Sequence, residues 1–588
     1  MNIFSILALI GGLVLFLYGM DLMGDSLKKL AGGKLESILA KLTSNRLKGF
    51  LLGFGVTAII QSSSATTVML VGFVNSGIMK LGQTISIILG ANVGTTVTAW
   101  LLSTASIGDT AGVIMKLLKP ESFTPVLALL GFFMISTAKN DKKKNGGLIL
   151  IGFAILMFGM EAMGDAVSGL KDDPNFTNVL TMFGNNPIMG ILVGTAFTAI
   201  IQSSSASIGV LQALSLSCII PYSTAIPLIL GMNIGTTITP IISSISGNTE
   251  SKRVAFSCLY IKMIGVIVVS SVFYAINAVV GFDFIKGQAS AFNIAVVHTL
   301  FNLVSTFILI PFCTLIEKLA LATIKGKSVA EEDNVFAILD ERFLAMPGFA
   351  VEKSKELVCK MADISYDSFI MATKLFENYD AKAFEEVKAL EGKVDKFEDK
   401  ISTYLVKIAE RPIPAKDSRL VTELLHCIGD IERISDHALN IAEVAEEISE
   451  KNIDFSEKAK QDIKVITEAV TEILAIALES LVSDDLTAAR KVEPLEQVID
   501  SLKRKIKNGH ISRLREGECT MELGFILSDL LTNYERIADH CSNIAVCFIE
   551  MSHDSFETHQ YLNQLKNEGD AEFNDLYKNY KAKYRIEG

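Results

Sequence analysis

The nine residues TAIIQSSSA occur twice in this chain, at Thr57–Ala65 and at Thr198–Ala206, and each copy lies within a long apolar stretch. Lipid offers no hydrogen-bond partners, so an unpaired hydroxyl, amide or backbone group in a bilayer is costly. Small hydroxyl residues that bridge packed helices would account for one such cluster. Two identical copies instead favour an internal repeat with a binding site near the membrane midplane, which is a recurring design of secondary transporters.

The repeat extends well beyond the serines. The segment LFLYGMDLMGDSLKKL at Leu15–Leu30 is echoed by LMFGMEAMGDAVSGL at Leu156–Leu170. Further on, GANVGTTVT at Gly90–Thr98 is echoed by GMNIGTTIT at Gly231–Thr239. The copies are 140 residues apart at the first landmark and 141 at the others. This constant offset predicts two units of one fold.

Lysine and arginine residues indicate how the two units are oriented. The segment after the first landmark is basic, whereas its counterpart at 161–190 carries only Lys171, next to two aspartates. By the positive-inside rule the first segment is cytoplasmic and its counterpart is external, so the repeats are predicted to be inverted and the N-terminus external. The basic residues of the first segment are Lys28, Lys29, Lys34, Lys41, Arg46 and Lys48.

These charges predict an all-α polytopic membrane domain with seven spans and two re-entrant hairpins. The hairpins are expected at 49–79 and 190–220, each with a QSSSA cluster at its tip. Irregular backbone at membrane depth is tolerated where it lines a cavity or is buried in protein, so the two tips should meet near the midplane. The spans are expected at 1–19, 82–106, 123–138, 147–164, 222–246, 254–280 and 293–316.

Composition divides the chain into two halves, because the sequence becomes rich in Lys, Glu and Asp from Lys318 onward. We predict a membrane transport domain at 1–316, with repeat 1 at about 1–138, repeat 2 at about 147–280 and a final span at 293–316. A linker at 317–344, cytoplasmic helical bundles at 345–560 and a C-terminal tail at 561–588 follow. The net charge of −11 does not favour nucleic acid, and the eight cysteines lack disulfide or metal-ligand spacing.

The repeated polar groups limit the chemistry of the site. Hydroxyl, amide and carbonyl oxygens form an uncharged cage that suits a small alkali cation, whereas N–H groups at helix N-termini suit an oxyanion. Because no Lys or Arg lies inside the tips, we infer that a co-bound cation supplies positive charge to the anion. The chain has no GxxxxGK[ST] loop, so transport should be secondary rather than driven by ATP.

The paired QSSSA and GxNxGTT motifs and the inverted halves resemble the type II sodium-phosphate cotransporter family over about residues 1–316. The resemblance implies a sodium-phosphate symporter of the cell inner (plasma) membrane that couples inward phosphate movement to a sodium gradient by alternating access. The halves differ at Thr66 against Ser207 and at Ala91 against Met232, which leaves sodium stoichiometry and anion choice open. The resemblance assigns sodium and phosphate binding to Gln61, Ser62, Ser63, Ser64, Gln202, Ser203, Ser204 and Ser205, and further to Asn92, Thr95, Thr96, Asn233, Thr236 and Thr237.

The soluble half contains its own duplication. ERISDHALNIAEV at Glu432–Val444 corresponds to ERIADHCSNIAVC at Glu535–Cys547, and EGKVD at Glu391–Asp395 corresponds to EQVID at Glu496–Asp500. Glu and Asp four residues apart share one face of a helix and repel each other without a counter-charge. Either Arg433 and Arg536 or a metal ion would supply that charge.

This half resembles the PhoU family of phosphate-regulatory proteins over roughly residues 345–560. The resemblance implies two tandem three-helix bundles that restrain uptake when cytoplasmic phosphate is high, with divalent or transition metal ions as cofactors. His437 and His540 are further candidate ligands. The residues at the metal-binding motif positions are Glu391, Asp395, Glu432, Asp436, Glu496, Asp500, Glu535 and Asp539.

Other functions remain open on the sequence alone. The strongest competitor is a sodium-coupled transporter for another anion, such as sulfate or an organic phosphate. An anion-sensing membrane receptor and a membrane-tethered metal-dependent hydrolase are weaker, the latter because the soluble half has no nucleophile and base signature. We therefore predict that the protein is not an enzyme and that its partners are phosphate, sodium and the lipid bilayer, and leave open whether it forms a homo-oligomer.

Overall fold

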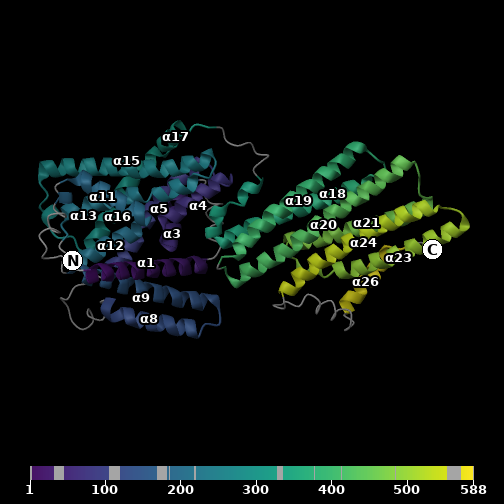
Figure 1. Cartoon of the computed structure of the whole chain (residues 1–588), viewed down its shortest axis with the longest axis horizontal. Helices are drawn as coiled ribbons and strands as arrows, with labels where there is room; N and C mark the ends of the chain where they lie inside the picture. The colour runs from purple at the N-terminus through teal and green to yellow at the C-terminus, as the bar shows by residue number, and fades with distance from the viewer. Residues whose placement is uncertain are drawn as a thin grey trace. The chain divides into compact units, whose positions relative to one another are not determined.

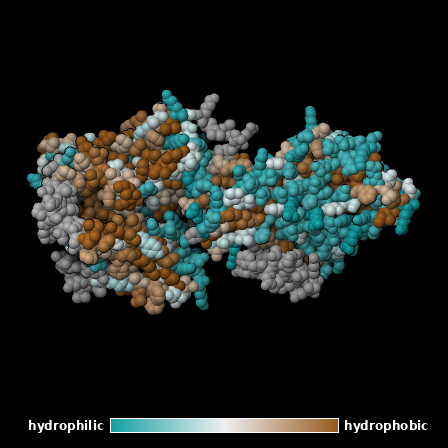
Figure 2. Space-filling view, viewed as in Figure 1, coloured by the Kyte–Doolittle hydropathy of each residue, from teal (hydrophilic) through white to brown (hydrophobic). Residues whose placement is uncertain are grey.

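The computed structural model describes residues 3–31, 45–104, 120–168, 182–184, 186–217, 220–326, 335–376, 378–411, 413–483, 485–552 and 571–586. These residues are almost entirely helical (Figure 1). They form two compact units, Met1–Phe349 and Ala350–Gly588. Hydrophobic side chains dominate the surface of the first unit and hydrophilic side chains that of the second (Figure 2). The apolar and polar halves of the sequence thus fall in two compact units, and the segment 317–344, predicted as a linker, belongs to the first of them.

The first unit contains six helices that are long and apolar enough to cross a membrane among the described residues. The predicted span at 123–138 falls on a shorter apolar helix, Ser122–Ser136 within α8. The helices are α1 (Ile3–Ala31), α3 (Arg46–Ile60), α4 (Ser63–Asn75), α5 (Leu81–Gly94), α6 (Thr96–Ser103), α8 (Pro120–Ser136), α9 (Asp141–Val167), α11 (Pro187–Ile201), α12 (Ser204–Ser217), α13 (Tyr222–Gly235), α14 (Ile238–Ser244), α15 (Thr249–Val280), α16 (Ala291–Leu309) and α17 (Cys313–Thr323).

Both QSSSA clusters lie between two short apolar helices, as predicted for re-entrant hairpins. The glutamine of each cluster, Gln61 or Gln202, has a left-handed backbone with φ of 61° that ends the preceding helix. Non-glycine residues seldom adopt this conformation. The chain then starts a new helix, and the axes of α11 and α12 differ in direction by 119°. The chain therefore bends sharply at Gln202 in repeat 2, and Gln61 has the same backbone conformation at the equivalent turn of repeat 1.

Helices α1 and α9 are equivalent in the two repeats and pack antiparallel, side by side (Figure 1). A Cβ atom on Gly19 would lie 2.6 Å from the carbonyl oxygen of Gly152, and one on Gly159 would lie 2.7 Å from that of Gly12. Gly12 and Gly19 occupy the repeat positions of Gly152 and Gly159. Gly12 therefore packs against the counterpart of Gly19, and Gly19 packs against the counterpart of Gly12. This is the geometry expected of inverted repeats.

The glycines of the GxNxGTT motifs also permit close helix packing. A Cβ on Gly90 would lie 2.0 Å from the carbonyl oxygen of Phe50 in α3, and one on Gly231 would lie 2.0 Å from that of Ile191 in α11. Glycines at these positions can also let a helix break. The structure shows both effects: Gly90 and Gly231 bring each hairpin's first helix onto α5 or α13, and these two helices end at the second glycine of each motif, Gly94 or Gly235.

The second unit consists of two helical bundles, and its long helices α20 and α24 pack against each other. In the predicted tail, α26 packs on α23, and Lys583 forms an ion pair with Glu472 at 2.8 Å. The helices are α18 (Pro347–Lys374), α19 (Ala381–Ala409), α20 (Ala415–Lys451), α21 (Glu457–Ser483), α22 (Leu486–Ala489), α23 (Val492–Glu516), α24 (Met521–Ser552) and α26 (Ala571–Lys583).

We expect Gly90→Ala to destabilise the first unit, Met1–Phe349, called the membrane unit below, by about 1–3 kcal/mol. The added methyl group must displace backbone atoms rather than a flexible side chain. The measurement is thermal unfolding of the purified protein in detergent. Gly55→Ala is the matched control, since nothing lies within 4 Å of a Cβ built there. Equal melting temperatures for the two variants would contradict this account of the packing.

Candidate functional site

Each hairpin tip is organised by the serine that follows its glutamine. The hydroxyl of Ser62 accepts a hydrogen bond from the backbone N–H of Ala65 at 3.1 Å, and Ser203 accepts one from Ala206 at 3.2 Å. These are N-cap interactions that fix the start of α4 and α12. The next two serines of each cluster are buried, with exposed fractions of 3–9 %. Helix N-termini with buried hydroxyls are therefore presented at both tips.

The structure brings the two tips together through Thr98, which follows the GxNxGTT motif of repeat 1. The Thr98 hydroxyl donates to the side-chain oxygen of Gln61 at 2.6 Å, and the Ser205 hydroxyl donates to Thr98 at 3.5 Å. Gln61 belongs to the first tip and Ser205 to the second. The predicted meeting of the tips is thus present as a direct chain of polar side chains. Thr98 was not among the predicted site residues, although it ends the repeated segment.

The threonines of the GxNxGTT motifs bond to their own helices. Thr95 and Thr96 donate to the carbonyls of Ala91 and Val93, at 3.0 and 2.7 Å. In repeat 2 the corresponding residues Thr236 and Thr237 donate to Asn233 and Ile234, at 2.7 and 2.8 Å. All four are buried, and their oxygen atoms retain lone pairs that can accept a further bond or hold a cation.

The two repeats differ at the site despite their identical motifs. Gln61 is 7 % exposed, whereas Gln202 is exposed. The Asn233 amide nitrogen donates to the carbonyl of Ile229 at 2.9 Å. The side-chain oxygen of its counterpart Asn92 is buried and has no partner among the described residues. Thr66 and Ser207 each donate to the serine carbonyl four residues earlier, but only the Thr66 hydroxyl also bonds to the hydroxyl of Thr57, at 3.0 Å. The counterpart of Thr57, Thr198, has a buried hydroxyl with no partner among the described residues.

A buried lysine lies at the site that the sequence analysis did not include. Lys262 of α15 is 6 % exposed and donates from its ammonium group to the Thr236 hydroxyl at 2.8 Å. It is the one charged residue in the stretch 254–282. Ionisable residues within a span are rare and typically functional, so this isolated charge was the available signal. The positive charge absent from the tips is therefore present beside the second GxNxGTT motif.

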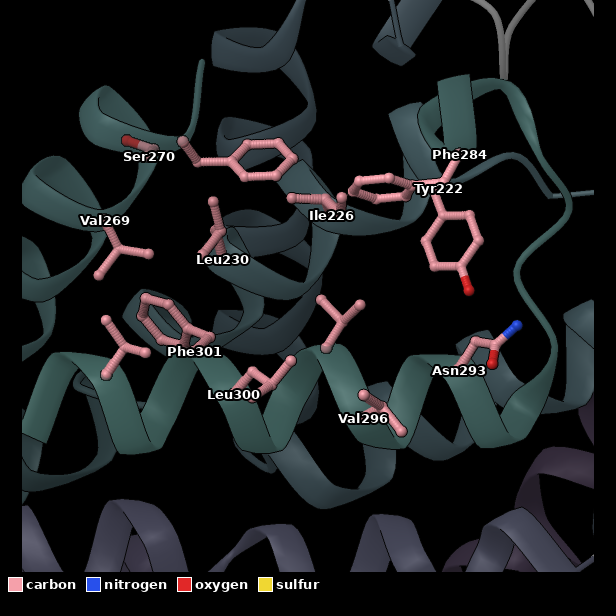
Figure 3. Close-up of a pocket in the computed structure, with 13 residues that line it drawn as sticks. Tyr222, Ile226, Leu230, Val269, Ser270, Phe284, Asn293, Val296, Leu300 and Phe301 are labelled. Atoms are coloured by element: carbon pink, nitrogen blue, oxygen red, sulfur yellow. The ribbon is translucent and has the colours of Figure 1, made fainter. Parts of the chain in front are cut away.

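The membrane unit also has a pocket of about 380 Å³ between α13, α15 and α16 (Figure 3). Its lining is almost wholly apolar, and Tyr222 and Asn293 lie together at one end (Figure 3). No charged side chain and no residue of the QSSSA or GxNxGTT motifs lines it. The pocket suits hydrocarbon rather than an anion, so it is not the predicted transport site.

In the second unit, the predicted carboxylates of the first bundle lie close together on α19 and α20. Burial raises the pKa of Glu432 to about 7, and the neighbouring carboxylates of Asp436 and Glu398 add to the shift. Burial also raises the pKa of Glu391, with contributions from Asp436 and Asp395. These groups form an acidic cluster that disfavours full ionisation.

In the second bundle the equivalent acidic groups have basic neighbours. Lys503 forms an ion pair with Glu535, and Arg536 lies 3.7 Å from Asp539. Arginine thus supplies part of the counter-charge in this bundle, as one sequence interpretation proposed. Among the described residues, no group of three or more His, Cys, Asp and Glu side chains is arranged to hold a metal ion. Metal binding therefore stays a prediction.

The two histidines of the duplicated motif stack against each other, with ring centroids 5.7 Å apart. His437 Nδ1 lies 2.8 Å from the side-chain oxygen of Asn533, and His540 Nδ1 lies 2.8 Å from that of Asp430. Asp430 and Asn533 are equivalent positions of the duplication. The histidines thus join α20 to α24 around a local two-fold axis, and this contact accounts for them without a metal ion.

Comparison with known proteins agrees with this division of the chain. The sequence model of the Na+/Pi-cotransporter family matches residues 15–165 and 155–286, and that of the PhoU domain matches 358–445 and 463–547. Each model matches twice, so both internal duplications are also recognised by the family patterns.

Relatives match either the whole chain or the membrane unit. A Salmonella typhimurium protein, whose provisional name is inorganic phosphate export protein YjbB, is 22 % identical and covers 95 % of this chain and 100 % of its own. Bacillus subtilis YqeW, an uncharacterized protein, is 30 % identical over 315 residues, which are 54 % of this chain and 97 % of its own. The sodium-dependent phosphate transport protein 2A of Rattus norvegicus is 36 % identical over 104 residues, or 17 % of this chain and 16 % of its own.

We expect Thr98→Val to lower the free energy of unfolding by about 1–3 kcal/mol, because the buried side-chain oxygen of Gln61 loses its donor. Thermal or denaturant unfolding in detergent measures the effect. Thr104→Val is the control, since Thr104 is more exposed and bonds to the carbonyl of Leu101 in its own helix. A loss no larger than in the control would contradict a structural link between the tips.

We expect Glu432→Gln to raise the melting temperature of the second unit at pH 8 and to have little effect at pH 4. The unfolded carboxyl ionises near its ordinary pKa of 4.5, whereas burial raises the pKa of the folded one to about 7, so the stability contributed by the protonated group is lost as pH rises from about 4.5 through 7. Differential scanning calorimetry of the metal-free protein measures this difference. Glu443→Gln, at an exposed site on the same helix, is the matched control.

Proposed function

Because this chain belongs to the Na+/Pi-cotransporter family, we propose that it is a sodium-coupled secondary transporter of inorganic phosphate in the plasma membrane. The observation that carries the proposal is the polar chain from Gln61 through Thr98 to Ser205, which joins the two hairpin tips. Paired helix N-termini favour an oxyanion, and the surrounding neutral oxygens suit sodium. Gln61, Ser62, Ser63, Ser64, Gln202, Ser203, Ser204 and Ser205 are the proposed ligands, together with Asn92, Thr95, Thr96, Asn233, Thr236 and Thr237.

Inverted repeats support transport by alternating access, since each tip belongs to one repeat and the repeats can move against each other around a shared site. The basic residues after α1 place that end of the helix in the cytoplasm, so the helical domain would also be cytoplasmic. A site formed by one tip from each inverted repeat does not by itself favour either direction of transport. The gradients of sodium and phosphate would decide the direction, and a sodium gradient directed inward would drive uptake.

Export is a second candidate, supported by similarity along the whole length of the YjbB relative, whose provisional name states export. The two candidates differ in the direction of transport and in its dependence on sodium, whereas the binding site would be the same. Efflux of phosphate from loaded vesicles without sodium would favour export, whereas dependence on sodium in both directions would favour the symporter.

We also propose that the PhoU domain regulates transport through the segment that leads into it. Phe343 in the short helix η7 (Glu341–Ala345) is fully buried, with its ring centroid 5.4 Å from that of Phe73 in α4. Asn75 at the end of α4 donates to Asp340 at 2.7 Å. The segment is thus fixed to the helix that begins at the first QSSSA tip, so a force on the segment would reach that tip.

We expect the double change Ser63→Ala plus Ser204→Ala to abolish sodium-dependent phosphate uptake, because one buried hydroxyl is lost at each tip. The measurement is uptake of radiolabelled phosphate into proteoliposomes with and without an inward sodium gradient. Ser76→Ala plus Ser217→Ala is the matched control at equivalent positions at the far ends of α4 and α12. Uptake of sulfate but not phosphate by the unchanged protein would overturn the choice of anion.

A further inference from the structure

We propose that Lys262 supplies a fixed positive charge to the bound oxyanion at the GxNxGTT motif of repeat 2. The proposal rests on the proposed function and adds one ligand to it. The residue lies 13 positions after the first residue of the 32-residue helix α15, or about 20 Å along its axis. An ammonium group at this depth is far from either end of the span and is costly to keep charged without a counter-charge.

The protein itself provides little compensation for this charge. Among the described residues, no acidic side chain forms an ion pair with Lys262, and its one hydrogen bond is to the Thr236 hydroxyl. That hydroxyl in turn donates to the carbonyl of Asn233 at 2.7 Å, so Thr236 is oriented to accept from the ammonium group. An ammonium group has three donors, and two remain for a ligand.

A second observation places unpaired polar groups in the same region. His298 of α16 is fully buried, and neither of its ring nitrogens has a hydrogen-bond partner among the described residues. It lies close enough to Lys262 for the two groups to interact electrostatically. Buried polar atoms in native proteins normally have hydrogen-bond partners. Ring nitrogens without partners, close to an ammonium group without a counter-charge, therefore indicate a place where a polar ligand binds.

Helix α15 also connects this lysine to the first hairpin. One turn before Lys262, the Cys258 thiol contacts the Thr67 hydroxyl of α4, and Thr67 donates to the carbonyl of Ser63 at 2.9 Å. The helix packs against α4, which begins within the first QSSSA cluster, and against α5 and α13, which carry most of the two GxNxGTT motifs. The ammonium group therefore lies on the face of α15 that is turned toward the proposed site.

The charge has a direct consequence for coupling. A sodium ion on the Thr236 oxygen would lie next to the ammonium group that already donates to it, and like charges at this distance repel strongly in a low-dielectric site. In repeat 1 the equivalent Thr95 hydroxyl also donates to its own helix, but no lysine among the described residues donates to it. The lysine therefore takes the electrostatic role of a cation at the second motif and leaves the first motif for sodium.

The test is binding of radiolabelled phosphate to the purified full chain in nanodiscs at fixed sodium concentration. We expect Lys262→Met to raise the phosphate Kd by about tenfold or more, because a charge-assisted hydrogen bond to the anion is lost. Lys262→Arg keeps the charge and should bind between wild type and Lys262→Met. Lys252→Met removes a partly exposed lysine near the start of the same helix and should bind as wild type.

The outcomes separate this inference from the proposed function. Phosphate binding within twofold of wild type in folded Lys262→Met would overturn the inference alone. An increased Hill coefficient for sodium with unchanged phosphate Kd would also overturn it, and would make Lys262 the occupant of a cation site. If the wild-type protein binds no phosphate, the proposed function fails, and the same titrations with sulfate then decide the role of the lysine.

Folding of the variants is checked by elution profile and thermal unfolding. Replacing an uncompensated buried charge by an apolar side chain of similar volume is often neutral or stabilising, so Lys262→Met should fold. Lys262→Gln provides a second uncharged variant. In both, the increase in melting temperature that phosphate causes in wild type should be lost, whereas an unchanged increase would count against the proposal.

Discussion

The membrane unit depends on helix backbones that approach each other at glycine. Gly90 and Gly231 bring α5 and α13 against the first helix of each hairpin, so closely that a single methyl group would overlap a carbonyl oxygen. These contacts determine where the hairpins turn back, because α3 and α11 end at a fixed height along their partners. The polar tips then lie at membrane depth, where their hydrogen-bonding groups need partners in the protein or in a bound ligand.

The two tips supply hydrogen-bond partners to each other. Gln61 adopts a left-handed backbone conformation, and Thr98 connects its buried side chain to Ser205 of the other repeat. A polar turn of this kind would be costly in a single hairpin within lipid. Two hairpins from inverted repeats bury each other's tips, so the duplication is a physical requirement of the site as well as a record of its origin.

Sequence reasoning predicted the repeats, both hairpins and the soluble helical half, because each depends on a pattern in consecutive residues. It did not predict Thr98 as the link between the tips, or Lys262 beside Thr236. Both contacts join segments far apart in the chain, and no spacing rule relates them. The GxNxGTT glycines show a different difficulty, since close packing and helix opening require the same residue and only the neighbouring backbone distinguishes them.

The rest of the chain contacts the two repeats unequally. Phe343 and Asp340 are bound to the end of α4, at Phe73 and Asn75, while the position in α12 equivalent to Asn75 is the apolar Leu216. Lys262 bonds to Thr236, whereas no lysine in the described part of the chain bonds to Thr95. Two tips with identical sequence would have equal energies if the protein were fully symmetric. Any difference in ion preference or control between them must therefore arise from residues outside the shared motifs, and these contacts are the ones in a position to produce it.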